Sequence, residues 1–373
     1  MNNTVGIVLT GGKHPALKDL ASMRSVSAVP VGSKYRAIDF VLSNMVNSGI
    51  KKVGIITQFS YRSLMDHLGS GKEWDLDRRH DGLFIFPPSL EENDTGWYKG
   101  TSDAIYNNLM FLNRSSEEYV IISQGNLVFK MDFNKMLQYH LQKDSDMTIA
   151  YKEMSDSPIN ELQQMGILAV SEDGRICDLQ EKPLTPLTNN ASMGIYLMKR
   201  KLLISLVEEC AAHGTYDLVK DIIIRKVPSL KIFGYKFEGY WRNLVNINNY
   251  YRCNMELLDP GIYAELFQKN WKIYTKVKDE APAKYNEEAE VRNSILGDGC
   301  IIEGTVDSSV LFRGVTVQKG AIVRDSIIMQ DSKIEEGAVV EYAIIDKGVT
   351  LTRSKYIKGD RSWPAVISKN AIV

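Results

Sequence analysis

Short apolar runs alternate with segments of helical periodicity over the first part of the chain. The runs at residues 5–9, 53–57, 119–123 and 147–150 are each long enough for one buried strand. Between them, residues such as 42–50 and 102–112 carry apolar side chains at helical spacing. Hydrophobic strands separated by helices favour a parallel, doubly wound α/β sheet. This pattern continues to about residue 258.

A glycine turn follows the first predicted strand. Thr10, Gly11 and Gly12 close the run at residues 5–9, and Leu17 and Leu20 then have helix-compatible spacing. Such a turn lies at the carboxyl end of a strand, where phosphate groups bind to backbone N–H groups. Gly11 and Gly12 are therefore candidate nucleotide-binding residues. Taken alone, two adjacent glycines favour a purely structural turn, because they are weak evidence for a ligand site.

The pattern changes again towards the C-terminus. From residue 291, aliphatic pairs recur roughly every five or six residues, with Gly, Asp, Ser and Glu between them and no helical periodicity. This repeat predicts a parallel β-helix of the hexapeptide type. An irregular antiparallel sandwich is the alternative, but the spacing is short for ordinary strands and loops. The pairs are Ile295-Leu296, Ile301-Ile302, Val310-Leu311, Ile322-Val323, Ile327-Ile328, Val339-Val340 and Ile344-Ile345.

These patterns divide the chain into two domains and a connection. We expect an α/β domain at residues 1–258 and a β-helix at residues 291–373. Residues 276–290 are rich in Lys, Glu, Ala and Pro, so we interpret residues 259–290 as a linker. A chain of 373 residues is long enough for two sizeable cores.

Composition excludes several classes of partner. A net charge of −1 gives no polycationic surface for nucleic acid and no attraction to anionic membranes. The four cysteines are widely spaced, which is typical of a reduced protein. The chain shows no secretion signal and no apolar run of membrane-spanning length. We therefore expect a cytoplasmic protein.

The order of landmarks resembles the ADP-glucose pyrophosphorylase family, also called glucose-1-phosphate adenylyltransferase. This resemblance implies a Rossmann-like nucleotidyltransferase domain with a doubly wound mixed sheet, a left-handed parallel β-helix, and a tetramer. The matching segments are Gly11-Gly12, Val29-Pro30, Lys34-Tyr35-Arg36, Ile38-Asp39-Phe40, Leu42-Ser43-Asn44, Asn47-Ser48-Gly49-Ile50, Trp74-Asp75-Leu76-Asp77-Arg78, Trp97-Tyr98-Lys99-Gly100-Thr101, Glu181-Lys182-Pro183, Ala191-Ser192-Met193-Gly194-Ile195-Tyr196 and Glu238-Gly239-Tyr240-Trp241.

The loop after the first strand departs from the family. Active members have a Gly-rich loop that ends in an arginine, which holds the nucleotide triphosphate. Here His14 replaces a glycine, Pro15 removes a backbone N–H, and Ala16 stands at the arginine position. No other side chain nearby clearly replaces the lost guanidinium.

Three further family residues are changed. The family's lysine before Pro-Ala-Val aligns with Val26. Its Gly-Asp-His becomes Gly125-Asn126-Leu127, and its later Trp-Arg/Lys-Asp ends in Asn243. In the family these two aspartates hold the magnesium that bridges the nucleotide phosphates. Because Asn offers no negative charge, we expect no tightly bound cofactor here, with Mg²⁺ confined to a catalytic partner.

The sugar-phosphate side matches the family better. The resemblance assigns glucose 1-phosphate binding to Glu181, Lys182 and Ser192. An isolated Glu-Lys-Pro would instead fit a solvated loop. Residues 216–221 partly match a His-Asp-Phe-Gly-Lys-Asp element, which makes Asp217 and Lys220 further candidates. The other expected substrate-binding residues are Tyr98, Gly100, Thr101, Asp103 and Gly166.

Three interpretations compete. The first is a catalytically deficient regulatory subunit, similar to the D-type subunit of bacterial glycogen synthesis, which forms a heterotetramer with a homologous catalytic subunit. The second is an active adenylyltransferase in which Lys13 replaces the loop arginine and Asn126 and Asn243 hold a weakened metal. The third, a hexapeptide acyltransferase, is poor because none of the five histidines lies beyond residue 291. Arg24, Lys34 and Arg36 form a basic cluster, which we interpret as solvated surface charge rather than an effector site.

Overall fold

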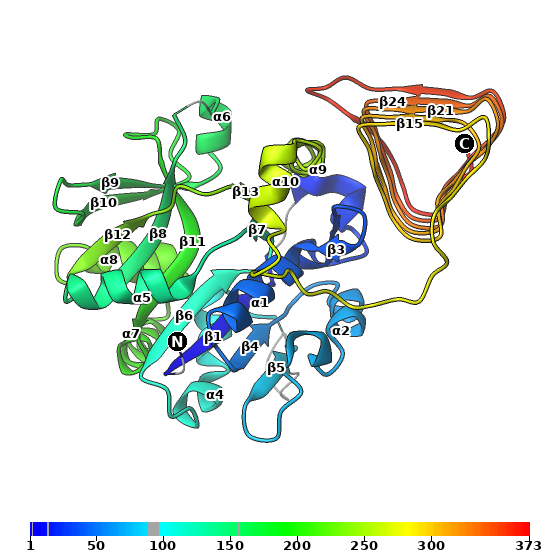
Figure 1. The fold of residues 1–373 in the computed structure, drawn as a ribbon. Helices are drawn as coiled ribbons and strands as arrows, with labels where there is room; N and C mark the ends of the chain where they lie inside the picture. Colours follow the sequence, from blue (N-terminus) through cyan, green and yellow to red (C-terminus); the bar gives the residue numbers. More distant parts are fainter. Residues whose placement is uncertain (2, 13–14, 89–96, 156) are drawn as a thin grey trace.

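A computed structural model describes residues 1, 3–12, 15–88, 97–155 and 157–373 of the chain. Figure 1 shows an α/β domain, a segment that crosses from it, and a C-terminal β-helix whose coils overlie one another as a triangle. Within the described residues, none of the helices has the length and apolar character needed to cross a lipid bilayer.

Over the described residues, the α/β domain is built on one sheet of nine strands. Its main path runs β10-β9-β11-β6-β1-β4-β5, and β8 pairs with β11 and with β12. The neighbours β1, β4, β5 and β6 are parallel, whereas β11 is antiparallel to β6 and to β8. The sheet is therefore mixed. The strands are β1 (Thr4–Leu9), β4 (Lys52–Ile56), β5 (Gly82–Phe86), β6 (Tyr119–Gln124), β8 (Met147–Glu153), β9 (Gly166–Val170), β10 (Ile176–Glu181), β11 (Asn190–Lys199) and β12 (Ile232–Lys236).

Helices cover both faces of this sheet. Alternate side chains of β1 enter different cores: Val5 and Ile7 pack with α3, α4 and α7, and Val8 packs with α1, α2 and α5. Two small ladders, β2 (Pro30–Val31) with β3 (Tyr35–Arg36) and β7 (Leu127–Phe129) with β13 (Trp241–Asn243), complete the domain. The helices are α1 (Ala37–Asn47), α2 (Arg62–Leu68), α3 (Thr101–Tyr106), α4 (Leu109–Asn113), α5 (Phe133–Gln142), α6 (Ile159–Leu162), α7 (Arg200–Ala212), α8 (Ile224–Lys226), α9 (Ile247–Glu256) and α10 (Pro260–Leu266).

The expected helices differ in detail from the observed ones. The helix predicted at residues 102–112 is two short helices, α3 and α4, separated at Asn107 and Asn108. The segment after the glycine turn, Pro15–Ala21, is not an α-helix but two short 3₁₀ turns on either side of a kink at Lys18, where φ is 47°. Between α3 and α4, the side chains of Asn107 and Asn108 donate to the carbonyl oxygens of Asp103 and Ala104. In the earlier segment, the backbone angles of Lys18 interrupt the regular hydrogen bonding.

The C-terminal domain is a parallel β-helix with three faces. Its strands form three five-stranded sheets, and consecutive partners such as Thr305, Ile322 and Val339 are 17 residues apart. Every predicted aliphatic pair lies in a strand. The strands are β14 (Lys284–Tyr285), β15 (Glu290–Arg292), β16 (Ile295–Leu296), β17 (Ile301–Ile302), β18 (Thr305–Asp307), β19 (Val310–Leu311), β20 (Thr316–Val317), β21 (Ile322–Arg324), β22 (Ile327–Ile328), β23 (Lys333–Ile334), β24 (Val339–Glu341), β25 (Ala343–Ile345), β26 (Thr350–Leu351), β27 (Tyr356–Lys358) and β28 (Ala365–Ile367).

The segment expected to be a linker, residues 259–290, contains regular structure at both ends. Helix α10 begins at Pro260 and is capped by Asp259, whose Oδ1 accepts from two backbone N–H groups. Near the other end, β14 pairs in parallel with β17, so the β-helix starts before residue 291. Residues between these elements form the irregular crossing segment of Figure 1.

The two domains share an apolar core. One cluster of buried residues joins Leu17, Leu20 and Val26 from the α/β domain to Phe312 and Met329 from the β-helix. Because these side chains are withdrawn from water on both sides, the contact is a packed interface rather than a loose hinge.

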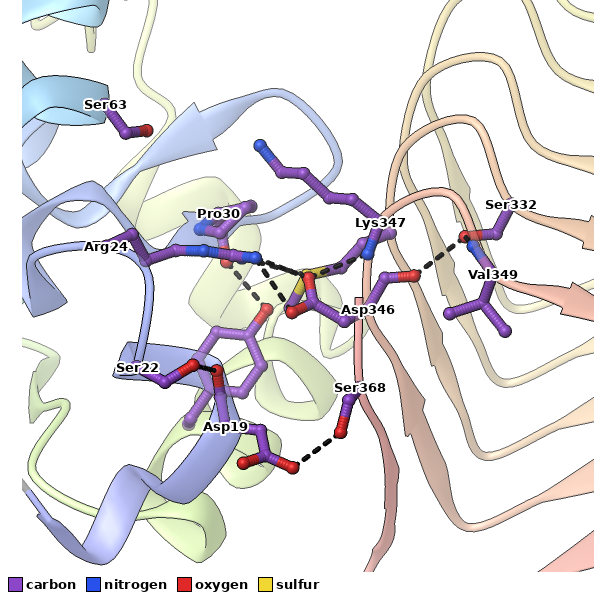
Figure 2. A network of polar contacts seen from close by, with 12 residues as sticks. Asp19, Ser22, Arg24, Pro30, Ser63, Ser332, Asp346, Lys347, Val349 and Ser368 are labelled. Carbon is purple, nitrogen blue, oxygen red and sulfur yellow. Dashed lines mark hydrogen bonds and ion pairs between the residues drawn. The ribbon is translucent and has the colours of Figure 1, made fainter. Parts of the chain in front are cut away.

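A buried ion pair lies in this interface (Figure 2). Nη2 of Arg24 donates to both carboxylate oxygens of Asp346, at 2.7 and 2.8 Å, and the two side chains are only 6% and 1% exposed. The expectation that Arg24 is solvated surface charge is therefore wrong. Sequence proximity to Lys34 and Arg36 suggested a surface cluster, but the partner of Arg24 is more than 300 residues away in the chain.

We predict that Arg24→Met lowers the free energy of unfolding by about 3–5 kcal/mol, because it leaves the Asp346 carboxylate buried without its partner. Denaturant unfolding measures the loss. The control Arg353→Met breaks a pair with Glu336 that is 75% and 57% exposed, and should cost no more than about 1 kcal/mol. Equal losses in the two variants would contradict the interface described here.

Lys347 gives a second prediction. Burial, together with the positive charges of Arg36 and Arg24, lowers the pKa of Lys347 to about 7, while Asp346 opposes the shift. Between this pKa and the ordinary lysine value, the unfolded chain holds a proton that the folded chain has lost. Stability should therefore rise from pH 7 towards pH 10, and Lys347→Met should remove this rise. The measurement is thermal unfolding of the parent chain and of Lys347→Met between pH 7 and pH 10, with Lys355→Met as the control variant.

Candidate functional site

Two neighbouring cavities open at the carboxyl ends of the central strands. The larger has a volume of about 520 Å³ and is lined by residues at or just after the ends of β1, β4 and β6. The smaller, of about 320 Å³, lies towards β9, β10 and β11. The carboxyl edge of an open α/β sheet is where ligands bind in such folds, so we treat the pair as one cleft with two compartments.

The glycine turn lies in the larger cavity. Gly11 and Gly12 both line it, and a Cβ on Gly11 would approach Cβ of Gln58 to 2.9 Å. Pro15 and Ala16 instead line the smaller cavity. Lys13 and His14 lie outside the described residues. The turn is thus at the cleft, and the alanine at the family's arginine position contributes only a methyl group there.

Val26 lies between the larger cavity and the apolar core that the two domains share. It lines the larger cavity, yet it is 5% exposed and belongs to the apolar core shared by the two domains. A lysine at this position could direct its ammonium group into the cavity, whereas the valine side chain is fixed by apolar packing.

Asn126 and Asn243 are hydrogen-bonded to each other. Strands β7 and β13 pair antiparallel with Asn243 opposite Leu127, which brings Asn126 beside the end of β13. The Nδ2 group of Asn126 donates to Oδ1 of Asn243 at 2.8 Å, and the backbone N–H of Leu244 donates to the carbonyl oxygen of Asn126 at 3.0 Å. The structure therefore brings together the two positions at which the family resemblance expects aspartates.

This amide pair does not fit a divalent cation. Asn243 Oδ1 already accepts a hydrogen bond, and Asn126 directs an N–H donor, not an oxygen, at its neighbour. A hard cation such as Mg²⁺ needs oxygen ligands with negative charge nearby. Within the described residues there is also no group of three or more His, Cys, Asp or Glu side chains that could hold a metal.

The smaller cavity gathers the predicted sugar-phosphate residues. Gly166, Glu181, Lys182 and Ser192 all line it. Gly166 is opposite Glu181 in the β9–β10 ladder, and a Cβ on the glycine would lie 3.3 Å from Oε2 of Glu181. The absence of a side chain at residue 166 therefore leaves room for the carboxylate. Lys182 has a positive φ of 50° and is 61% exposed, so its ammonium group is accessible to an anion.

Glu181 has a perturbed acidity. Its partial burial raises the pKa of the carboxyl group, the adjacent Lys182 opposes this, and the charge of Asp217 adds to it. Protonation reduces repulsion between this carboxyl group and a phosphate. The compartment therefore combines one accessible cation with an acid that is held closer to neutrality than an exposed glutamate.

The remaining predicted substrate residues lie on the other side of the cleft. Tyr98, Gly100 and Thr101 line the larger cavity. Thr101 Oγ1 accepts from the backbone N–H of Leu218 at 2.9 Å, which attaches the start of α3 to the neighbouring segment. Asp103 lines neither cavity. Its carboxylate accepts from the Lys99 backbone N–H at 2.7 Å and so stabilises the first turn of α3.

Gln58 and Gln124 carried no recognised signal in the sequence, and Val219 lay in the matched segment 216–221 without being assigned a role. Gln58 lines the larger cavity and donates from Nε2 to the carbonyl oxygen of Tyr98 at 2.8 Å. Gln124 and Val219 line both cavities. Gln124 directly precedes Gly125-Asn126, so its position at the end of a predicted strand was the available indication.

Comparisons with known proteins agree with this architecture. The protein-family model "Nucleotidyl transferase" matches residues 5–260, and "GlmU-like, C-terminal hexapeptide" matches residues 280–363. Proteins named glucose-1-phosphate adenylyltransferase from Bacillus cereus, Bacillus mycoides and Bacillus anthracis are each 38% identical over 366 residues. These alignments cover 97% of this chain and 96% of each relative. The chain belongs to the glucose-1-phosphate adenylyltransferase family.

Proposed function

We propose that this chain is a catalytically deficient, regulatory subunit of a glucose-1-phosphate adenylyltransferase, the enzyme that forms ADP-glucose for glycogen synthesis. It binds glucose 1-phosphate and modulates a homologous catalytic subunit in a cytoplasmic heterotetramer. The observation that carries the proposal is the hydrogen bond between Asn126 and Asn243, where the family has two aspartates.

The argument is electrostatic. Joining a sugar phosphate to a nucleotide α-phosphate brings negatively charged groups together, so the reaction depends on positioning and on neutralising charge. The two amides contribute no charge to hold a cation. Ala16 and Val26 remove the family's arginine and lysine from the same cleft. Three separate means of neutralising phosphate charge are thus absent from these positions.

The sugar-phosphate compartment supports a binding role. Lys182 is accessible, Gly166 leaves room for Glu181, and Ser192 lines the same cavity. A chain that binds a sugar phosphate without transferring a nucleotide can still influence a partner. The bound ligand favours one conformation of the chain, and that conformation acts on the partner. The catalytic partner supplies Mg²⁺ and turnover in this proposal.

We predict that the purified chain releases almost no pyrophosphate from ATP, Mg²⁺ and glucose 1-phosphate. Co-assembly with a catalytic family member should raise that partner's rate or its affinity for substrate. A coupled pyrophosphate assay on the two chains, alone and mixed, makes the measurement. Turnover by the pure chain at the rate of an active relative would refute the proposal.

A second prediction concerns the amide pair directly. Asn126→Asp/Asn243→Asp places two carboxylates in contact at a partly buried site, and their repulsion should lower the melting temperature by several degrees in EDTA. Mg²⁺ should restore it, because the ion binds the folded state between the two acids. Thermal unfolding with and without Mg²⁺ gives a readout that does not require activity.

The matched control is the single variant Asn126→Asp. One carboxylate can accept a hydrogen bond from the amide of Asn243, so this variant should stay close to the parent stability and respond weakly to Mg²⁺. If the double variant shows neither a loss in EDTA nor a gain with Mg²⁺, the two positions do not share a cation site. If the double variant does respond to Mg²⁺, adding Ala16→Arg and Val26→Lys to it should recover part of the transferase activity.

A further inference from the structure

We infer that Gln124 and Val219 divide the cleft, so that it accepts a sugar phosphate and excludes a nucleotide sugar. This inference rests on the proposed function, because it concerns the selectivity of the same sugar-phosphate compartment. A nucleotide sugar joins its two parts through one diphosphate. It must therefore pass through the boundary between the two cavities, whereas glucose 1-phosphate needs only one of them.

The cavity linings locate this boundary. Four residues line both cavities: Gln124, Glu181, Lys182 and Val219. Glu181 and Lys182 come from the end of β10 and form the sugar-phosphate side already described. Gln124 and Val219 come from other parts of the chain and meet them at the boundary. Neither belongs to the residues that the family resemblance assigns to binding.

Gln124 lies at the end of β6, where the neighbouring strand β11 is irregular. The register of β11 against β8 shifts between Ser192 and Ile195, and Gly194 within this bulge has a positive φ of 69°. A Cβ on Gly194 would lie 2.9 Å from Cδ of Gln124. The glutamine side chain therefore packs against the bare backbone of the bulge. Among the described residues, its carboxamide has no hydrogen-bond partner.

Val219 is held in place by its own backbone. Asp217 Oδ1 accepts from the N–H groups of Val219 and Lys220, at 2.9 and 2.8 Å, which fixes the start of the π-helix Leu218–Ile223. The valine side chain also packs at the edge of the core that contains α3 and α7. Because the backbone is fixed, the branched side chain stays at the boundary. The family element that residues 216–221 resemble has a glycine here.

The amide pair extends the same boundary. Asn126 lines the larger cavity and Asn243 the smaller, so their 2.8 Å hydrogen bond connects one compartment to the other. A diphosphate passing between the cavities would meet two neutral amides and Val219, and Lys182 is the accessible cation that lines both cavities. The division of the cleft is therefore mainly steric, and the two amides add no positive charge that would favour a diphosphate.

The test is the variant Gln124→Ala/Val219→Gly, studied by calorimetry without Mg²⁺. The parent chain should bind glucose 1-phosphate clearly and ADP-glucose at least tenfold more weakly. The double variant should bind ADP-glucose at least tenfold more tightly than the parent, with less than a threefold change for glucose 1-phosphate. The matched control is Val245→Gly, because Val245 lines only the smaller cavity and its removal does not open the boundary.

Two results would overturn the inference: ADP-glucose binding by the parent as tightly as glucose 1-phosphate, or no gain in the double variant. If Val219→Gly prevents folding, as judged by circular dichroism, Gln124→Ala alone must still improve ADP-glucose binding. These outcomes are separate from failure of the proposed function. Turnover by the parent chain, or failure of the parent chain to bind glucose 1-phosphate, would refute the proposed function. Tight ADP-glucose binding by an inactive parent chain would refute only the division of the cleft.

Discussion

The hydrogen bond between Asn126 and Asn243 joins two strands that are more than 100 residues apart in the chain, and it does so without any charge. The β7–β13 ladder positions both amides at the junction of the two cavities. A donor on one side chain meets an acceptor on the other, so this contact forms without a ligand or an ion. Under the proposed function this neutrality limits the chemistry of the cleft, because Asn126 lines one compartment and Asn243 lines the other.

The cleft and the domain interface share one short segment. Arg24 binds Asp346 of the β-helix, while Val26, two residues later, lines the larger cavity and packs in the core between the domains. A shift of the β-helix that broke the buried ion pair would act on the wall of the cavity through two peptide units. For a subunit whose proposed role is to modulate a partner, this connection supplies a physical path between distant parts of the chain.

Much of the fold follows from aliphatic patterning, and the exceptions have local causes. Strands with two adjacent aliphatic residues, such as Ile327-Ile328, were predictable from the sequence. Strands such as Lys333–Ile334 were not, because only Ile334 faces the core and the lysine beside it is solvated. The burial of Arg24 was also beyond prediction, since it depends on a partner in another domain. In the site, the loss of charge was visible at Asn126 and Asn243, but a lone glutamine such as Gln124 carries no pattern that indicates its position between two cavities.

The substitutions that remove the cation site also relieve a cost. Two aspartates in contact at a partly buried position repel each other unless a cation lies between them, and functional sites commonly contain such destabilising arrangements. Amides of nearly the same size keep the shape of the site and replace the repulsion with a hydrogen bond. Selection for turnover would oppose the replacement of the two aspartates by asparagines. Selection for a stable subunit with a sugar-phosphate compartment would favour this replacement. Under the proposed function, the lining around Glu181 and Lys182, beside a neutral junction, is the combination that this second kind of selection would produce.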